Sequence, residues 1–303
     1  MTYGCRSSKG FILISVLMAS TLFLGAAASF ALFAKTQMRK VSDREFALQA
    51  RTLAVVACND VSDWIAGDTN AFDSAREKLY TGVPLVLRFD DWKVIINIVP
   101  QDALIPINAI FLPDGVTIKK EYEYAWEKIW EILDKEDIAP IVLDFLDKDS
   151  EPRTGGREET GNANGMISDL SELLILPEVN AALLYGNKNG DPSLSDFFTV
   201  YGGEKINFNL VPRHVLSILD PDIWGAVLDS MMDYRSKNNA AKADDIAGMT
   251  SFPKTAAVRL NNVIAFKSDY FLVRMSVGHL GREHNFAIMM KRAPKCQIIY
   301  WRE

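Results

Sequence analysis

An uncharged, largely apolar stretch of 24 residues, 11–34, lies near the N-terminus of this 303-residue chain. As an α-helix it would be about 36 Å long, and the hydrocarbon core of a bilayer is about 30 Å thick. A helix this long and this uniformly apolar is seldom buried inside a soluble protein. The stretch therefore predicts one transmembrane helix at 11–34.

The charges that flank this stretch indicate its orientation. Arg6 and Lys9 precede it without any acid, which favours a cytoplasmic N-terminus. Lys35, Arg39 and Lys40 follow it and weaken that preference. Long domains cross the membrane largely regardless of such charges. We therefore expect the N-terminus inside and the main domain outside.

Three interpretations of this N-terminus are open. A secretory signal would have an apolar core of about 7–15 residues and a small-residue cleavage site, for which Ala26–Ala28 is a candidate. A simple signal anchor would stay uncut. The sequence Lys9-Gly10-Phe11 resembles the type IV prepilin processing site. That resemblance implies that a membrane peptidase cuts after Gly10 and methylates Phe11, so that 1–10 is a leader.

Ser15 would be the fifth residue of the mature chain, where most pilins have Glu. A carboxylate inside the bilayer is costly unless it has a partner. In pilin filaments, which this N-terminus resembles, that partner is the N-terminal amine of the subunit above. A subunit at the filament tip has no neighbour above it, so a neutral Ser15 suits a tip position. The alternative is that Ser15 is only a small helix-packing residue.

The helical pattern continues beyond the predicted span. Apolar residues recur with a period of 3.6 residues at Phe46, Ala50, Leu53, Ala57, Val61 and Trp64. Gly67-Asp68 is a plausible helix end. We therefore expect a helical region at 11–70 whose last part packs against a soluble domain, a layout that resembles pilins.

Strand-like segments rich in Val, Ile and aromatic residues lie on both sides of the middle region. They are Leu85–Phe89, Trp92–Val99, Asp269–Val277, Asn285–Lys291 and Gln297–Trp301. Asp90-Asp91 would form a turn and Gly278–Glu283 a loop. Together these strands predict one antiparallel sheet, built from 71–118 and 250–303.

The middle region is predicted to be helical. Its helix-like segments are Glu121–Leu133, Ile138–Leu146, Asp169–Leu176, Pro212–Leu219 and Pro221–Tyr234, the last with Asp220 as N-cap. They form a helical insert, 119–249, between strands of one sheet. The predicted fold class is α+β: a long N-terminal membrane helix on an antiparallel sheet, with a large helical insert.

The order of several segments in the insert resembles one family, the minor pseudopilin K of the type II secretion system. The segments are Ile141–Glu159 (IVLDFLDKDSEPRTGGREE), Asp169–Leu176 (DLSELLIL), Phe197–Tyr201 (FFTVY) and Lys205–Pro212 (KINFNLVP). The resemblance covers nearly the whole chain. This family also lacks Glu at the fifth position of the mature chain, and in this sequence that position is Ser15.

The resemblance implies a pilin-like fold and a function in protein export across the outer membrane. It implies a single-pass protein of the bacterial inner membrane, with its main domain in the periplasm at the tip of a short pseudopilus. The implied partners are other minor pseudopilins, the inner-membrane assembly platform and the prepilin peptidase. It also implies calcium bound in the insert.

An acidic segment of the insert is the candidate metal site. Its six acids are Asp144, Asp147, Asp149, Glu151, Glu158 and Glu159, and Asn162 and Asn164 follow them. Asp147, Asp149, Glu151 and Glu158 have the spacing of EF-hand ligands. Pro152, however, stands where that loop needs Gly.

The segment is therefore not an EF-hand but an oxygen-rich loop, and Gly155-Gly156 would let it fold around a hard cation. Asn162 and Asn164 could add carbonyl oxygens. We predict calcium here, with the six acids and Asn164 as candidate ligands. The alternative is an acidic, solvated loop.

Other chemistry finds little support in the sequence. Only three histidines are present, and no H-E-x-x-H, G-x-S-x-G or Walker A motif occurs. The net charge of −6 opposes binding to nucleic acid, although Lys205–Leu219 slightly resembles a helix-hairpin-helix module. Cys58 and Cys296 would form a disulfide or stay buried free thiols.

The sequence thus favours a structural pseudopilin without enzymatic activity. The first alternative is a minor pilin of a type IV pilus. The second, of a different class, is a membrane-tethered periplasmic enzyme or sensor.

Overall fold

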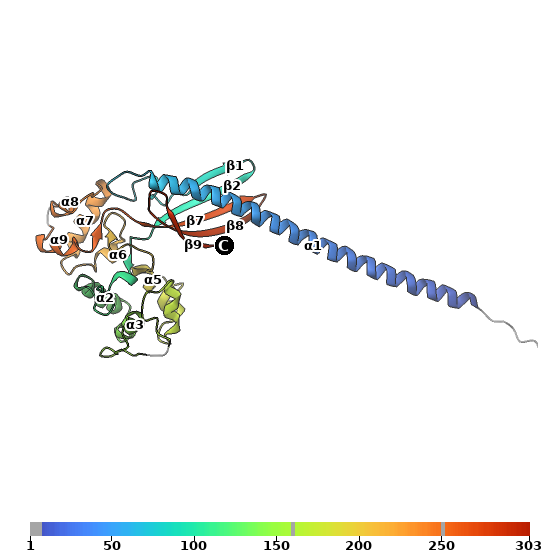
Figure 1. Ribbon diagram of the computed structural model, residues 1–303, viewed down its shortest axis with the longest axis horizontal. Coiled ribbons are helices and arrows are strands. Elements are labelled where there is room, and N and C mark those ends of the chain that lie inside the picture. The colour runs from blue at the N-terminus through green and yellow to red at the C-terminus, as the bar shows by residue number, and fades with distance from the viewer. Residues whose placement is uncertain (1–7, 159–160, 250–251) are drawn as a thin grey trace, which may run out of the picture. The chain divides into compact units, whose positions relative to one another are not determined.

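Helix α1 (Ser8–Ala66) contains the whole apolar stretch and continues past it without a break (Figure 1). The computed structural model describes residues 8–158, 161–249 and 252–303. They divide into two units, with the boundary between Val56 and Ala57 inside α1. In the first unit the helix is long and apolar enough to cross a membrane, and none of its most apolar window is buried. It therefore has the character of a single membrane anchor.

The last turns of α1 belong to the second unit and present one buried face. Ala57 and Val61 are fully buried, as the apolar stripe predicts, and Ile65 joins them. Trp64 is only half-buried. The helix ends at Ala66, where the amide of Gly67 donates to the carbonyl of Asp63 at 2.8 Å. The predicted end at Gly67-Asp68 is thus confirmed.

Cys58 and Cys296 are both buried and free. Cys58 lies on α1, and Cys296 donates its backbone N–H to the hydroxyl of Ser62 at 3.1 Å. Burial raises the pKa of the Cys58 thiol to about 11. The sequence leaves open whether these cysteines form a disulfide or stay free, and in the structure they are free thiols.

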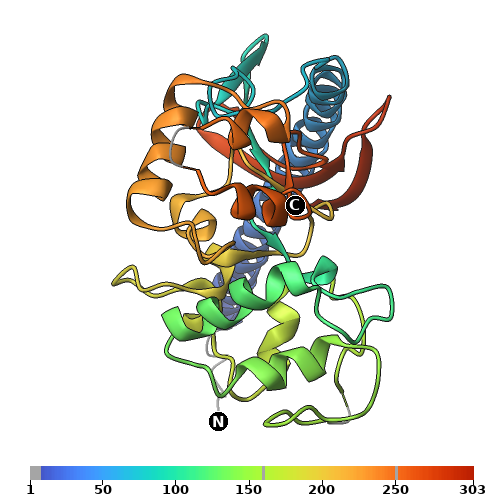
Figure 2. The same ribbon diagram turned by 90° about the vertical axis from the view of Figure 1, so that its left-hand side faces the viewer.

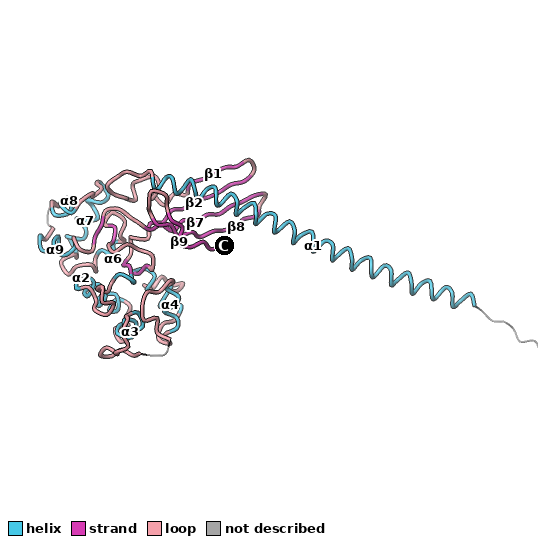
Figure 3. The backbone as a smooth tube through the Cα atoms, in the orientation of Figure 1, coloured by secondary structure: helices cyan, strands magenta, loops and turns pink. Residues whose placement is uncertain are grey.

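The second unit contains a five-stranded antiparallel sheet (Figure 3). Its order is β1-β2-β7-β8-β9. The strands are β1 (Leu85–Phe89), β2 (Trp92–Pro100), β7 (Tyr270–His279), β8 (Arg282–Lys291) and β9 (Gln297–Arg302). Alternation of apolar residues buries one face, so all five predicted strands are confirmed to within a few residues.

The connection between β7 and β8 is shorter than the sequence suggests. The expected loop Gly278–Glu283 is a two-residue turn, Leu280-Gly281, with φ values of 48° and 79°. Positive φ at both central residues is typical of a type I′ turn, whose twist matches that of the strands. Both strands therefore extend further than their β-rich residues indicate.

The region between β2 and β7 is mainly helical, with short strands (Figure 2). Its helices are α2 (Lys120–Ile132), α3 (Ala139–Leu146), α4 (Ala181–Tyr185), α5 (Leu194–Phe197), α6 (Arg213–Leu216), α7 (Gly225–Lys237), α8 (Ala243–Ala247) and α9 (Lys254–Leu260), with 3-10 helices η1 (Ile107–Ala109) and η2 (Leu170–Ile175). Its strands are β3 (Ile105–Pro106), β4 (Phe198–Thr199), β5 (Ile206–Asn207) and β6 (Ile264–Ala265).

One hydrophobic core joins these elements, and its residues run from Ile105 to Ile264. It is therefore wider than the expected insert. β3 pairs with β4, and β5 pairs with β6, both in parallel. No subdivision of the second unit is resolved, so the insert boundaries of 119 and 249 remain a prediction.

Helix α2 shows why this region folds as it does. Tyr122, Trp126, Ile129 and Trp130 recur along one face and are all buried. The rings of Trp126 and Trp130 lie 5.5 Å apart, and Trp126 also contacts Phe198 at 5.6 Å. Aromatic burial of this kind fixes α2 against the core on which the acidic segment is built.

The expected helix start at Asp220-Pro221 is wrong, because α7 begins only at Gly225. Asp220 is buried, and its carboxylate accepts from Arg259 Nε at 2.6 Å and Nη2 at 2.8 Å. The side chain that would cap a helix is thus engaged by an arginine far along the chain.

The region Asp169–Leu176 forms the 3-10 helix η2, capped by Asp169, in place of an α-helix.

Candidate metal centre

Helix α3 positions the acidic segment. Val142, Phe145 and Leu146 are buried in the core, and the helix ends where Asp147 becomes extended, with φ −75° and ψ 174°. The carbonyl end of a helix carries partial negative charge, which repels carboxylates and attracts cations. Acidic residues at this end of the helix are therefore stabilised by a nearby positive charge.

Three of the predicted ligands converge beyond α3. Carboxylate oxygens of Asp147, Asp149 and Glu158 all lie within 4.8 Å of one another. Asp147 is fully buried, and the other two are half-buried. Asp147 Oδ1 and Glu158 Oε1 are buried oxygens that accept no hydrogen bond within the described part of the chain. Such oxygens are costly to bury unless something positive binds them.

The electrostatics of Asp147 reflect this crowding. Burial, with smaller contributions from the neighbouring Asp149 and Asp144, raises the pKa of its carboxyl to about 6. Arg153 acts in the opposite sense, because its Nη2 lies 2.7 Å from Asp147 Oδ2. One guanidinium thus offsets part of the negative charge of the cluster.

Asp144 has a different role from the three converging acids. It is fully buried, and its carboxylate accepts from the backbone N–H of Arg153 at 3.1 Å. Arg153 Nε lies 3.4 Å from Asp144 Oδ1. A Cβ at Gly156 would lie 2.0 Å from Asp144 Oδ2, and Gly155 has φ of +81°. The glycine pair therefore lets the segment fold back onto this carboxylate.

The other candidate ligands lie around this group. Glu151 is exposed and outside the converging three, and Glu159 lies outside the described residues. The side-chain amide of Asn164 donates to the backbone carbonyl of Asp149 at 3.0 Å. The amide of Asn162 donates to Glu158 Oε2 at 2.8 Å and so orients that carboxylate. Asn164 thus supports the backbone of the loop, whereas Asn162 supports a candidate ligand.

Sequence reasoning missed the structural role of Arg153. It also missed the bidentate pair of Arg157 Nη1 and Nη2 with Glu178, at 2.8 and 3.0 Å. Arg153 has a local signal, since it follows Asp147 by six residues in an acidic loop. The pairing with Glu178 has none, because the two residues are far apart in sequence.

The donor set fits a hard divalent cation. All three converging groups are carboxylates, and Ca²⁺ binds oxygen ligands at about 2.3–2.6 Å. Oxygens on opposite sides of such an ion are about 4.8 Å apart, so three oxygens that lie within 4.8 Å of one another are close enough to share one ion. Two of the oxygens are also buried without a partner among the residues described. Calcium as the bound ion and the individual ligands remain predictions from the sequence.

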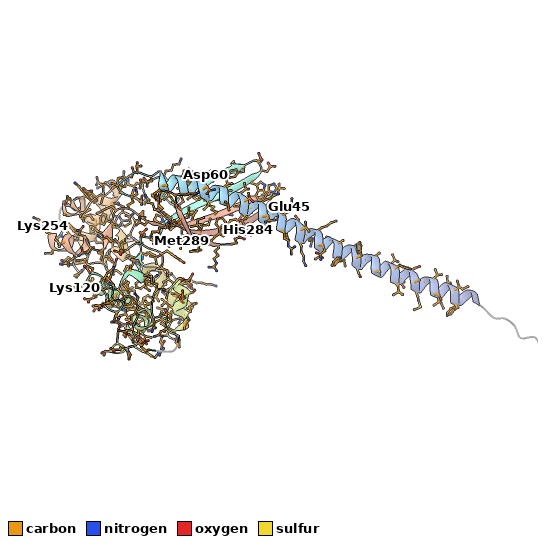
Figure 4. The ribbon with its side chains drawn as sticks, in the orientation of Figure 1. Glu45, Asp60, Lys120, Lys254, His284 and Met289 are labelled. Carbon is orange, nitrogen blue, oxygen red and sulfur yellow. The ribbon has the colours of Figure 1, made fainter. Side chains whose placement is uncertain are left out.

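The three histidines have structural contacts. His279 stacks on Trp92 at 4.5 Å, and His214 Nε2 lies 3.0 Å from the carbonyl of Asp196. His284, labelled on β8 in Figure 4, packs against Phe286 at 4.8 Å. Each ring therefore has a packing or hydrogen-bonding role.

The comparisons with known proteins bear on the fold. No protein-family model matches the sequence, and no curated protein sequence matches it. Among solved structures, the chain is similar to a chain of the GspK-GspI-GspJ complex from the enterotoxigenic Escherichia coli Type 2 Secretion System, with a TM-score of 0.60. The match covers 89% of this chain and 98% of that chain, at 16% sequence identity. The chain therefore has the pilin-like α+β fold that its resemblance to the minor pseudopilin K family implies.

Proposed function

We propose that this chain is a minor pseudopilin of a type II secretion system. It is a structural subunit at the tip of a short periplasmic pseudopilus that serves protein export across the outer membrane. The observation that carries the proposal is the structural match to a secretion-complex chain over nearly the whole of both chains. The match extends far beyond a membrane helix and a sheet, so it includes the helical region that most distinguishes this chain.

The proposal gives the chain protein partners. The matched chain forms a complex with other Gsp proteins of its secretion system. By analogy, this chain assembles with other minor pseudopilins and meets the inner-membrane assembly platform. Its N-terminal helix is the natural surface for this packing, because in 11–33 the side chains are exposed and mostly apolar. The prepilin peptidase would act on Gly10-Phe11 before assembly.

Ser15 supports a position at the tip. Its hydroxyl donates to the carbonyl of Phe11 at 2.9 Å, within its own helix. The side chain is therefore satisfied without a neighbouring subunit, whereas a carboxylate at this position would need one. A subunit with nothing above it gains from this neutrality.

The converging acids would hold a structural calcium ion. When bound, the ion would supply the positive charge that Asp147, Asp149 and Glu158 lack. Asn162 keeps Glu158 oriented, and Asp144 holds the loop backbone at Arg153. The chain's own residues thus fold the loop, and the role of the site is to stabilise the insert and not to perform chemistry.

The first test is intact-mass and N-terminal peptide analysis of the chain purified from membranes of its own cells. Loss of 1–10 with a methyl group on Phe11 is the expected result. Gly10→Val should block the cut. Gly25→Ala, where a Cβ would meet nothing within 4 Å, is the matched control and should be processed normally. Cleavage near Ala26–Ala28, or no cleavage, would contradict the proposal.

A second measurement separates type II secretion from a type IV pilus. Deletion of the gene should stop release of secreted proteins into the medium and leave surface pili unchanged. Loss of pili with normal secretion would instead identify a minor pilin.

A further inference from the structure

The open face of the sheet, opposite its buried side, carries a groove. Cross-strand partners in an antiparallel sheet project to the same side, so the register defines rows on this face. In one row Ile95 pairs with Ser276, which pairs with Asn285. In the next row Asn97 pairs with Arg274, Arg274 with Ala287, and Ala287 with Arg302. These two rows line the hollow, here called the basic groove, whose volume is about 450 Å³.

The basic groove is named for its cations. Arg274 and Arg302 are both exposed and lie on either side of Ala287. On the same face, the row next to that of Ile95, on the side away from Asn97, contains Lys93 and its partner Arg88. Both of these residues are exposed. None of the four forms an ion pair with another residue in the described part of the chain. They gather on one face of a protein whose net charge is −6.

Two carboxylates lie near these cations, and both have contacts of their own; Glu303 is itself one of the residues that line the groove. Glu303 accepts from the indole N–H of Trp301 at 3.2 Å. Glu283 lies 3.4 Å from the hydroxyl of Ser276. The residues that line the groove thus include two arginines and one carboxylate, so the lining carries a net positive charge.

The side chains that line the groove favour an occupant that carries carboxylates. An arginine guanidinium binds a carboxylate through two parallel hydrogen bonds. Asn97, Ser276 and Asn285 offer uncharged donors and acceptors, which suit peptide groups, and Ile95 adds apolar surface. A hollow of this kind accommodates side chains, whereas a plane of lipid headgroups would contact only its rim.

We propose that the basic groove docks an acidic segment of a partner protein, with carboxylates of the partner on Arg274 and Arg302. The inference rests on the proposed function only in that a subunit of an assembly must have partners. It adds the chemistry of one interface, which lies on the sheet and not on the N-terminal helix.

The test uses the full chain in the membrane of its own cells, with a photo-reactive amino acid in place of Asn97. Irradiation should yield one protein adduct, whose cross-linked peptide contains at least two Asp or Glu residues. The control position is Leu280, which is 84% exposed at the β7–β8 turn and outside the groove. It should give no such adduct.

Charge reversal then tests the arginines. The double variant Arg274→Glu/Arg302→Glu should lower the yield at Asn97 about tenfold or more, because two charge-assisted pairs are lost. Reversing the acids of the captured segment to Lys should restore the yield. The control variant Lys120→Glu/Lys254→Glu makes the same change in net charge at two exposed helix starts, labelled in Figure 4, and should leave the yield unchanged.

Several outcomes would overturn the inference: an adduct with phospholipid, an adduct with a second copy of this chain, a partner segment without acids, no adduct, or a yield that charge reversal leaves intact. If the charge-reversed chain fails to fold, Arg274→Gln/Arg302→Gln provides the same comparison. Processing after Gly10 is recorded in every variant. A processed chain without the adduct rejects the groove and leaves the proposed function standing, whereas an unprocessed chain with the adduct does the reverse.

Discussion

At the scale of single residues, the acidic segment depends on one close approach. Gly156 is required because a side chain there would collide with the buried carboxylate of Asp144. Asp144 in turn holds the backbone of Arg153, whose guanidinium reaches Asp147. Gly156 supplies no ligand atom itself. Through Asp144 and Arg153 it nevertheless affects the position of Asp147, one of the converging acids.

Gly156→Ala should destabilise the protein by about 1–3 kcal/mol, because the added methyl group must displace a buried carboxylate. The measurement is denaturant unfolding of the full chain in detergent with a chelator present. Gly278→Ala is the control, since its Cβ would meet its first neighbour at an ordinary 3.5 Å. Equal stability of the two variants would contradict the role given to Gly156.

Glu158→Gln should weaken calcium binding about tenfold, because a charged ligand becomes neutral while its shape is kept. Isothermal titration of the full chain with Ca²⁺ measures the effect. Glu151→Gln removes the same charge from an exposed residue outside the converging group and should change the affinity little. Similar losses in both variants would mean that only net charge matters.

The sequence predicts the composition of this site better than its geometry. The spacing of Asp147, Asp149, Glu151 and Glu158 contains the three acids that converge, but it also includes Glu151, which is exposed and lies outside that group. It cannot show that Asp144, one helical turn earlier, faces Arg153. The direction of a side chain at a helix end depends on how the following loop folds back, and Gly155-Gly156 only permits that fold.

At the scale of elements, one arginine attaches the segment after α1 to the sheet. Arg292, just beyond β8, donates through Nη2 to both oxygens of buried Asp73, at 2.9 and 2.8 Å, and to the hydroxyl of Tyr80 at 3.1 Å. Its guanidinium also lies 5.1 Å from the ring centroid of Phe271 on β7. The loop from α1 to β1 is therefore fixed by a buried ion pair.

Arg292→Met should cost about 3–5 kcal/mol of stability, because it leaves the carboxylate of Asp73 buried without its partner. The double variant Arg292→Met/Asp73→Asn should recover much of that loss, and a double-mutant cycle of unfolding free energies measures it. Arg213→Met breaks an exposed pair with Asp229 and should cost less than about 1 kcal/mol. Equal costs at both arginines would contradict this account.

Elements with a strong periodic pattern were predictable, and those decided by distant contacts were not. The five strands and α2 follow from apolar spacing alone. The start of α7 does not: Asp220 Oδ1 accepts from the backbone N–H of Asp222 at 2.9 Å and the same carboxylate binds Arg259, yet the helix begins only at Gly225. The strand pairs β3–β4 and β5–β6 are two residues each and have no sequence signature.

At the scale of the whole molecule, calcium should stabilise the chain as a ligand of the folded state. At a free concentration 100 times the dissociation constant, the expected gain is about 2.7 kcal/mol. Thermal unfolding of the full chain with Ca²⁺ and with a chelator should show a higher Tm with the ion. The variant Asp149→Asn/Glu158→Gln should lose this difference. A Tm that does not respond to Ca²⁺ would leave an acidic, solvated loop.

The overall fold could be predicted because its main features are long and periodic. The apolar stretch at 11–34 and the alternating strands specify a helix and a sheet, and the ordered segments of the insert suggest their arrangement. The extent of the shared core could not be predicted. Ile105 and Ile264 lie in segments that look like parts of the sheet, yet both are buried in the core of the helical region.

The order of the strands has a consequence for how the chain is made. β2 pairs with β7, and about 170 residues separate the two, so ribosomal synthesis completes β1 and β2 long before their neighbour exists. A hairpin of two strands is marginal by itself, and the exposed edge of β2 invites wrong pairing during that wait. The core between Ile105 and Ile264 can condense meanwhile, since its residues emerge before β7. Closure of the sheet is then the last event of folding, and a delay in it would leave β2 open to aggregation.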